Sequence, residues 1–190
     1  MKLYGSTTSP YVRRIRIVLA QTPHEFIDLQ IFGGKDRELL ASRNPTLKVP
    51  CLEDEGEMIF DSRVIHSYLS EKLNLDPLTW EEENLLTLID AANDSFVQLL
   101  ILQRSEFDIN DEKLYFRLQN ERIEAVLSTL EAQLLEGGFS GWSYPEICLY
   151  TMVDWCIFRE LHDFASYPTL LEFHEKHQDR IELTATDPRQ

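Results

Sequence analysis

The sequence predicts an α/β domain followed by an all-α domain, and two observations support this fold class. Up to residue 73, short apolar segments typical of strands alternate with helical patterns, whereas beyond residue 79 only helical periodicity remains. Between them, segment 74–79 reads Asn-Leu-Asp-Pro-Leu-Thr and breaks the periodicity. We therefore expect domains at 1–73 and 80–190, joined by a linker at 74–79.

The first domain is expected to follow the order βαβαββα. Ser9 and Pro10 offer an N-cap and a proline at the first helical position, which indicates a helix that begins there and ends before Pro23. A second helix is predicted at 36–42, ended by Asn44-Pro45, and a third runs from 61–62 to 73 with apolar residues one turn apart. Strands are predicted at 2–4, 26–29, 48–52 and 58–60.

The second domain is expected to contain four main helices, at about 80–104, 111–136, 144–160 and 168–178. Gly137-Gly138 ends the second of these. Ser143 and Glu146 have the S-x-x-E spacing of a capping box, in which the two side chains satisfy backbone N–H groups at the start of a helix.

Composition restricts the partners that the chain can have. The 33 acidic residues exceed the 18 lysines and arginines, giving a formal net charge of -15 that repels polyanions, so no nucleic acid is expected. The N-terminus offers no apolar leader and no later apolar stretch reaches about 18 residues, which predicts a cytoplasmic protein with no membrane partner. With 43% hydrophobic residues, the chain can bury one or two cores.

Metal and dithiol chemistry are not expected. The three cysteines, at 51, 148 and 156, form no C-x-x-C pair and no metal-ligand spacing, and reduced thiols explain them. His174 and His177 form an i, i+3 pair for which the sequence reveals no carboxylate or cysteine partner, so we interpret them as part of a solvated helix face.

Three features of the first domain could bind or activate a ligand. A cis bond between Val49 and Pro50 would direct the Val49 backbone outward to pair with an extended peptide, although an ordinary trans edge proline explains the same residues. Asp61 and Ser62 open a helix whose N–H groups can hold a carboxylate while Asp61 accepts from an ammonium; simple capping is the alternative.

Ser9 lies at another helix N-terminus, where its hydroxyl could donate to a thiolate. A hydrogen bond to a charged group contributes about 1.5–3 kcal/mol, or about one to two pKa units, and together with the helix dipole this would make the thiolate a large fraction at neutral pH. N-capping by Ser9 is the alternative. Neighbouring hydroxyls compete for the same role, at Tyr4, Ser6, Thr7, Thr8 and Tyr11.

Taken together, these motifs resemble the cytosolic glutathione S-transferase family, in particular bacterial, serine-type members. The resemblance covers essentially the whole chain and rests on motifs in order and spacing: 9–13 (Ser-Pro-Tyr-Val-Arg), 44–45 (Asn-Pro), 48–52 (Lys-Val-Pro-Cys-Leu) and 60–65 (Phe-Asp-Ser-Arg-Val-Ile). In the second half, segment 139–147 resembles the helix-initiating box of that family, with Glu146 where Asp is usual, and 153–155 and 167–170 follow as in many bacterial members.

The resemblance implies a thioredoxin-like N-terminal domain, a helical bundle and a site for glutathione. Pro50 would be cis, Val49 would hold the cysteinyl backbone and Ser9 would activate the sulfur. Asp61 would grip the γ-glutamyl end, although it is one methylene shorter than the Glu or Gln usual in the family. The resemblance also gives roles to Ser62 at the γ-glutamyl end, Arg63 as an assistant, Lys48 at the glycyl carboxylate and Tyr11 in a second-substrate pocket.

The function expected from the resemblance is conjugation of the glutathione thiolate to a small, largely apolar electrophile in detoxification, with glutathione as co-substrate, no metal and a homodimeric assembly. The alternative is a non-catalytic module of the same fold that binds protein, as the stringent-starvation proteins do. Thiol-disulfide exchange is the third reading and needs a cysteine at position 9, where this chain has Ser9.

Overall fold

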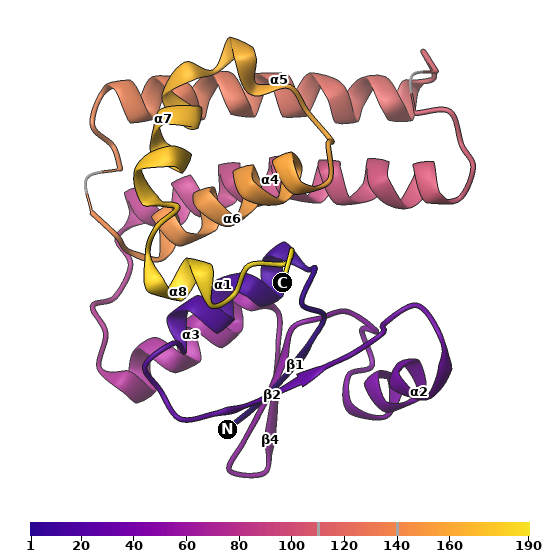
Figure 1. Cartoon of the computed structure of the whole chain (residues 1–190), viewed down its shortest axis with the longest axis vertical. Coiled ribbons are helices and arrows are strands. Elements are labelled where there is room, and N and C mark those ends of the chain that lie inside the picture. The colour runs from indigo at the N-terminus through magenta and orange to yellow at the C-terminus, as the bar shows by residue number, and fades with distance from the viewer. Residues whose placement is uncertain (110, 140) are drawn as a thin grey trace. The chain divides into compact units, whose positions relative to one another are not determined.

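The computed structural model describes residues 1–109, 111–139 and 141–190. It divides into two compact units, the first formed by 1–77 together with 179–190 and the second by 78–178 (Figure 1). Ser140, which belongs to the 139–147 motif above, lies outside the described residues. The chain leaves the first unit within the segment that the sequence predicts as the linker.

A four-stranded sheet organises the first unit, with strand order β2-β1-β3-β4. The central strands are β1 (Lys2–Gly5) and β3 (Cys51–Asp54), and the edges are β2 (Glu25–Asp28) and β4 (Glu57–Phe60). β1 pairs in parallel with β2 and antiparallel with β3, which is itself antiparallel to β4. The two central strands are the more buried ones, as expected for a sheet covered on both faces.

Helices cover both faces of this sheet (Figure 1). On one face, α2 (Gly34–Arg43) packs Leu40 into a buried cluster with Tyr4, Leu29 and Cys51. On the opposite face lie α1 (Pro10–Val18) and α3 (Ser62–Leu73), which contact each other. Because side chains alternate along a strand, Leu3 and Leu52 point away from the α2 face, and both are fully buried.

β3 begins at Cys51, three residues later than the strand predicted at 48–52. The reason is a side chain: Asn44 Nδ2 donates to the carbonyl of Lys48 at 2.8 Å, which engages that carbonyl outside the sheet. Residues 48–50 therefore lie in a loop that leads into the strand. The other predicted strands and helices of this unit are present, with ends shifted by one to a few residues.

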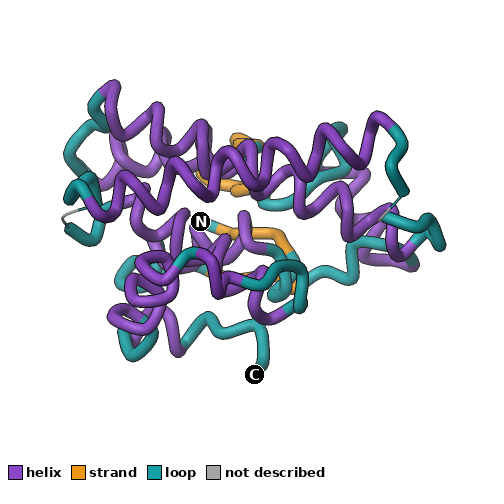
Figure 2. The backbone as a smooth tube through the Cα atoms, turned by 90° about the horizontal axis from the view of Figure 1, so that it is seen from above, coloured by secondary structure: helices purple, strands orange, loops and turns teal. Residues whose placement is uncertain are grey.

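Among its described residues, the second unit contains helices joined by loops and no strand (Figure 2). Its α4 (Trp80–Arg104) packs against α5 (Leu114–Leu135) and α6 (Tyr144–Phe158), and α7 (Pro168–His177) packs against α5 and α6. Every residue of α6 from 144 to 156 is buried, which makes α6 the central helix. A short 3-10 helix, η1 (Phe164–Ser166), was not predicted from the sequence.

Capping boxes begin α4 and α6. Thr79 and Glu82 form a reciprocal capping box at α4, with Glu82 N donating to Thr79 Oγ1 at 3.2 Å and Thr79 N donating to Glu82 Oε2 at 2.7 Å. At α6 the Glu146 carboxylate accepts from the backbone N–H of Ser143 at 2.9 Å and from its hydroxyl at 2.6 Å. The capping role predicted for Ser143 and Glu146 is therefore confirmed.

By length and composition alone α4 could cross a membrane, since an 18-residue window in it has a mean hydropathy of 1.5. The core helix of a globular unit passes the same test, and α4 buries residues such as Leu86, Ile89 and Phe96 in the second unit. We interpret α4 as a core helix, and the expectation of no membrane partner stays a prediction.

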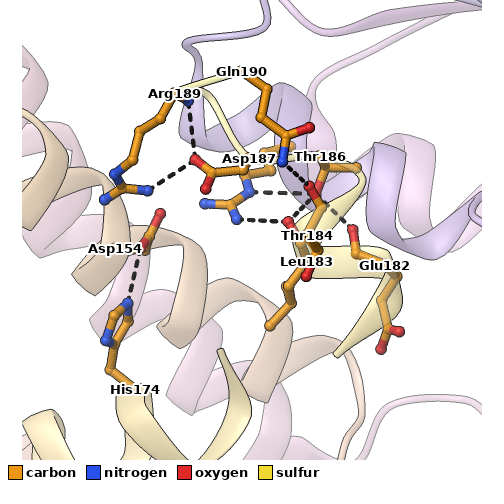
Figure 3. A network of polar contacts seen from close by, with 10 residues as sticks. Asp154, His174, Glu182, Leu183, Thr184, Thr186, Asp187, Arg189 and Gln190 are labelled. Atoms are coloured by element: carbon orange, nitrogen blue, oxygen red, sulfur yellow. Dashed lines mark hydrogen bonds and ion pairs between the residues drawn. The ribbon is translucent and has the colours of Figure 1, made fainter. Parts of the chain in front are cut away.

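The histidines of α7 are packed rather than solvated, which corrects the interpretation from sequence. The imidazole Nε2 of His174 lies 2.8 Å from Asp154 Oδ1 of α6 (Figure 3), and the ring stacks on Tyr150 with centroids 4.9 Å apart. His177 is buried and stacks on Trp142 at 4.6 Å. Asp154 lies 20 residues from His174, so spacing along the sequence could not reveal this carboxylate partner.

The C-terminal segment also departs from the prediction, which placed it in a helical domain at 80–190. Residues 179–190 group with the first unit, and they include a short helix, α8 (Ile181–Thr184), that the sequence did not predict. The physical reason lies in α1: the buried guanidinium of Arg13 donates to the carbonyl of Leu183 at 3.1 Å and to Thr186 Oγ1 at 3.3 Å.

Candidate functional site

The candidate site lies at one end of the sheet in the first unit. Across β1, β3 and β4 the ladder aligns Tyr4 with Cys51 and Cys51 with Phe60. The chain leaves β1 toward Ser9, enters β3 from Pro50 and leaves β4 into Asp61 at this same end. The topology therefore brings Ser9, the Val49–Pro50 segment and Asp61 to the same end of the sheet.

Ser9 is the N-cap of α1. Its side-chain oxygen accepts from the backbone N–H of Val12 at 3.4 Å, a long contact, while its own N–H donates to the carbonyl of Ser6 at 3.0 Å. The residue is half-buried. A hydroxyl that accepts one hydrogen bond keeps its own hydrogen to donate, so capping and donation to a ligand are compatible at Ser9.

The turn between β1 and α1 is held close to the sheet. A Cβ atom at Gly5 would lie 2.4 Å from Val12 Cγ2, so only glycine permits this approach of β1 to α1. On the β2 side, the N–H of Thr7 donates to Asp28 Oδ1 at 3.0 Å. The first turn of α1, with Ser9 at its start, is thereby placed beside the end of β1.

The Val49–Pro50 peptide bond is cis. Pro50 is buried, and Val49 just before it is half-buried. Both residues lie outside the sheet ladder, because the first pair between β1 and β3 joins Tyr4 to Cys51. Lys48, before them, is exposed. The backbone of Val49 thus lies just beyond the end of the central strand β3, outside the ladder, where an extended peptide could pair with it.

Two residues that the sequence analysis did not assign to the site hold this loop. Asn44 is 1% exposed; besides donating to Lys48 O, its Oδ1 accepts from the N–H of Thr46 at 2.9 Å and from its hydroxyl at 2.8 Å. Arg37 Nη1 donates to the carbonyls of Ile31 at 3.3 Å and Leu47 at 3.0 Å. The Asn44-Pro45 pair is the sequence signal that could have indicated this role, but the same pair is equally typical of a helix end.

Asp61 and Ser62 stand at the junction of β4 and α3. Asp61 is exposed, has a φ of 71° and accepts from the N–H of Arg63 at 2.8 Å through Oδ1, which makes it the N-cap. Ser62, the first residue of α3, is 3% exposed, and Arg63 is half-buried. The capping that the sequence offered as an alternative is present, and the helix N-terminus lies beside the Asp61 carboxylate.

The other hydroxyls near Ser9 differ in their contacts. Tyr4 donates to Glu53 Oε2 at 2.6 Å on the α2 side of the sheet, and burial together with Glu53 raises the pKa of its phenol to about 12. Ser6 Oγ and Thr8 Oγ1 lie 3.3 Å apart. Tyr11 is half-buried with the Arg14 guanidinium 4.8 Å from its ring centroid. Tyr4 is therefore a packing residue of the cluster below α2.

The cysteines in the structure are buried and unsuited to thiol exchange. Cys51 follows Pro50 directly but is 0% exposed, and burial raises the pKa of its thiol to about 11. Among the residues that the structure describes, no group of three or more histidine, cysteine, aspartate or glutamate side chains could hold a metal ion.

Comparison with solved structures defines the class of fold first. The crystal structure of a glutathione S-transferase from Methylobacillus flagellatus KT, solved with glutathione bound, matches with a TM-score of 0.85 over 97% of this chain and 98% of that chain. The sequence identity is 23%, so this likeness shows the fold alone. The fold is a thioredoxin-like domain with a helical domain, as predicted.

Sequence comparison then identifies the family. The family described as "Glutathione S-transferase, N-terminal domain" matches residues 3–77. The uncharacterized GST-like protein YibF of Escherichia coli (strain K12) is 34% identical over 154 residues, which cover 72% of this chain and 71% of that protein. The chain belongs to the glutathione S-transferase family. A stringent starvation protein A homolog from Coxiella burnetii is 33% identical over 78 residues, 41% of this chain and 37% of that protein.

Proposed function

We propose that this protein is a glutathione transferase that joins the glutathione sulfur to a small, largely apolar electrophile. The observation that carries the proposal is the convergence of Ser9, the Val49–Pro50 segment and Asp61 at one end of the sheet. Bound glutathione in the related fold from Methylobacillus flagellatus supports the same ligand. The proposed setting is a cytoplasmic, homodimeric detoxification enzyme that uses glutathione as co-substrate and no metal.

In the proposed complex, the backbone of Val49 pairs with the cysteinyl residue of glutathione, in the manner of an added strand. The α-carboxylate of the γ-glutamyl end binds at the α3 N-terminus through Ser62, and its ammonium binds the Asp61 carboxylate. Arg63 and Lys48 add positive charge for the two carboxylates of the tripeptide. These contacts hold the sulfur near Ser9.

The role proposed for Ser9 is to stabilise the thiolate. The glutathione thiol loses its proton to solvent, the Ser9 hydroxyl donates to the resulting thiolate, and the thiolate attacks the electrophilic carbon as the leaving group departs. A hydrogen bond to a charged group contributes about 1.5–3 kcal/mol, which lowers the thiol pKa by about one to two units from its usual value of about 8.5. Tyr11, one residue into α1, is proposed to face the second substrate.

The test combines calorimetric titration with glutathione and a conjugation assay on a chlorinated nitrobenzene. We expect binding and turnover in the wild type, whereas Ser9→Ala should raise the pKa of the bound thiol by about one to two units and lower turnover accordingly. Ser6→Ala is the matched control, because Ser6 lies in the same turn. An unchanged pH profile in Ser9→Ala would move the activating role to a neighbouring hydroxyl.

The second candidate is a non-catalytic module of the same fold that binds protein, favoured by the likeness to the stringent starvation protein A homolog. Glutathione binding without turnover on any tested electrophile would favour this candidate. Absence of glutathione binding would remove the enzyme proposal altogether.

A further inference from the structure

The C-terminal segment 179–190, here called the strap, is anchored on α1 within the first unit (Figure 1). Its short helix α8 buries Leu183, which is 1% exposed, and Thr186 just beyond the helix is 5% exposed. A C-terminal segment held only by chance contacts would expose such side chains to solvent. The strap is therefore packed as part of the first unit.

Arginines of α1 bind the C-terminal end of α8. Arg13, which is 4% exposed, donates from Nη2 to the carbonyl of Leu183 at 3.1 Å and from Nε to Thr186 Oγ1 at 3.3 Å. Arg16 Nη2 donates to the carbonyl of Ala185 at 3.5 Å. The last carbonyls of a helix have no partner within that helix, and cationic side chains satisfy them well.

The contact between Arg13 and Thr186 requires a hydroxyl at position 186. Thr186 Oγ1 donates to the carbonyl of Glu182 at 2.8 Å (Figure 3). This leaves the lone pairs of its oxygen to accept from Arg13 Nε. The guanidinium of Arg13 stays charged at any physiological pH, so a buried acceptor aimed at it is costly to remove. An apolar side chain of the same shape would lose both hydrogen bonds.

Arg13 lies one helical turn from Ser9, and its backbone N–H donates to the carbonyl of Ser9 at 3.0 Å. The cap that Ser9 itself supplies is long, at 3.4 Å from Val12 N to Oγ, and is weak by ordinary hydrogen-bond geometry. What holds the side chain of Arg13 in place therefore also helps to hold the first turn of α1.

We propose that the strap positions Ser9 for glutathione, with Arg13 and Thr186 as positioning residues that act through the first turn of α1. This inference rests on the proposed function, since it gives the strap a role in thiol activation by Ser9. It adds a determinant at the far end of the chain to a site otherwise built from residues 9–63.

The test compares Thr186→Val with Thr186→Ser and Thr184→Val in the full-length protein. Thr186→Val keeps the shape but removes the hydroxyl, whereas Thr186→Ser keeps the hydroxyl. Thr184→Val is the matched control, because Thr184 lies in the same segment, is exposed, and donates its hydroxyl to Arg180 O within the strap. Each variant is first confirmed to be folded at the assay temperature by its thermal unfolding curve.

Two readouts decide the proposal: hydrogen–deuterium exchange of peptides covering 10–18 without glutathione, and the pH profile of the thiol of bound glutathione. We expect Thr186→Val to speed exchange in α1 and to raise the apparent thiol pKa by about half a unit, which lowers the thiolate fraction at neutral pH by about 1.5- to 2.5-fold for a bound thiol with a pKa of about 6.5–7.5. Thr186→Ser and Thr184→Val should match the wild type in both.

Contrary outcomes are distinct. If Thr186→Val only lowers the unfolding temperature, with exchange in α1 and the thiol pH profile both unchanged, the strap is merely stabilising and the proposal is overturned. If the wild type does not bind glutathione, the proposed function fails and the role of the strap in thiol activation fails with it. In that case the exchange experiment alone decides whether the strap holds α1.

Discussion

Asp61 joins β4 to α3 with a φ of 71°, in the left-handed half of the Ramachandran map where aspartate and asparagine are among the more frequent residues other than glycine. Its carboxylate caps α3 through the N–H of Arg63. In the proposed complex the same carboxylate accepts from the ammonium of glutathione. Capping needs only an oxygen acceptor, whereas the ammonium gains most from a negative charge.

Asp61→Asn separates these two tasks. Asparagine caps helices as well as aspartate does and tolerates positive φ, so we expect the free energy of unfolding to stay nearly constant. Affinity for glutathione should fall about fivefold, because a charge-assisted hydrogen bond contributes about 1 kcal/mol more than a neutral one. Calorimetric titration measures the affinity and urea unfolding the stability. Equal affinity of the wild type and Asp61→Asn for glutathione would show that the Asp61 carboxylate does not bind the ammonium of glutathione.

Asp54, at the end of β3, shows how a carboxylate far from the proposed site contributes to stability. Its side chain is 7% exposed, lies 3.8 Å from the N-terminal ammonium and accepts from Tyr68 at 2.7 Å and from Lys72. Burial by itself would raise the pKa of Asp54, but the hydrogen bonds from Lys72 and Tyr68 outweigh it and lower the pKa below its usual value. The pKa of Lys72 is raised, chiefly by its hydrogen bond to Asp54.

The sign of the pH dependence follows from these shifts. A carboxyl whose pKa is lower in the folded state stabilises fully above its unfolded pKa of about 3.9, and this contribution is lost as the pH falls through the folded value. We expect Asp54→Asn to be less stable than the wild type at pH 7, with the difference shrinking below about pH 4. Urea unfolding between pH 7 and about pH 3 measures this difference in stability. Glu57→Gln is the matched control, because Glu57 is an exposed carboxylate on the same hairpin. A pH-independent difference would contradict the prediction.

Among the elements, β1 and α1 are coupled by the close approach at Gly5. A methyl group there would lie 2.4 and 2.6 Å from the two Cγ atoms of Val12, and Val12 is fully buried. Because β1 is paired on both sides, with β2 and with β3, we expect the clash to be relieved by displacing the start of α1, which carries Ser9. Overpacking of this kind costs about 1–3 kcal/mol.

We therefore predict that Gly5→Ala destabilises the protein by about 1–3 kcal/mol in urea unfolding and reduces turnover through displacement of Ser9. Val12→Ala creates room, so the double variant Gly5→Ala/Val12→Ala should be more stable than the sum of the two single changes predicts. Additive effects in this double-mutant cycle would show that the two residues do not contact each other.

How well an element could be predicted depended on how local its determinants are. The bounds of α4 agree with the predicted 80–104, because Thr79 and Glu82 supply a complete capping signal next to a long apolar pattern. By contrast α8 is four residues long, too short for periodicity to reveal, and its packing depends on Arg13, about 170 residues away. The partner of His174 was missed for the same reason, since Asp154 belongs to another helix.

The candidate site shows the same division. Ser9, Pro50 and Asp61 were found from the sequence because each carries a local signal, a cap or a proline at a strand end. Their convergence needed the register of β1, β3 and β4, which the sequence suggests only through the family resemblance. Asn44 and Arg37, which hold the loop before Pro50, act through side-chain hydrogen bonds to backbone carbonyls, and the sequence does not show which carbonyls these are.

For the whole molecule, charge is the property with the broadest consequences. A net charge of -15 over 190 residues makes two copies repel each other unless apolar contacts outweigh the repulsion. Large apolar side chains are exposed on several helices, among them Val64 on α3 and Leu114 and Leu118 at the start of α5. A second copy could bury such side chains, which agrees with the homodimer expected from the family resemblance.

We predict a homodimer of twice 22.2 kDa whose dissociation constant depends on salt in a defined direction. Raising sodium chloride from 0.1 to 1 M shortens the screening length from about 10 to about 3 Å, so repulsion between the acidic copies weakens and the dimer should tighten. If salt bridges between copies dominated instead, the same change would loosen the dimer. Sedimentation velocity across a dilution series at each salt concentration measures the constant, and a 22.2 kDa species at micromolar concentration throughout would contradict dimerisation.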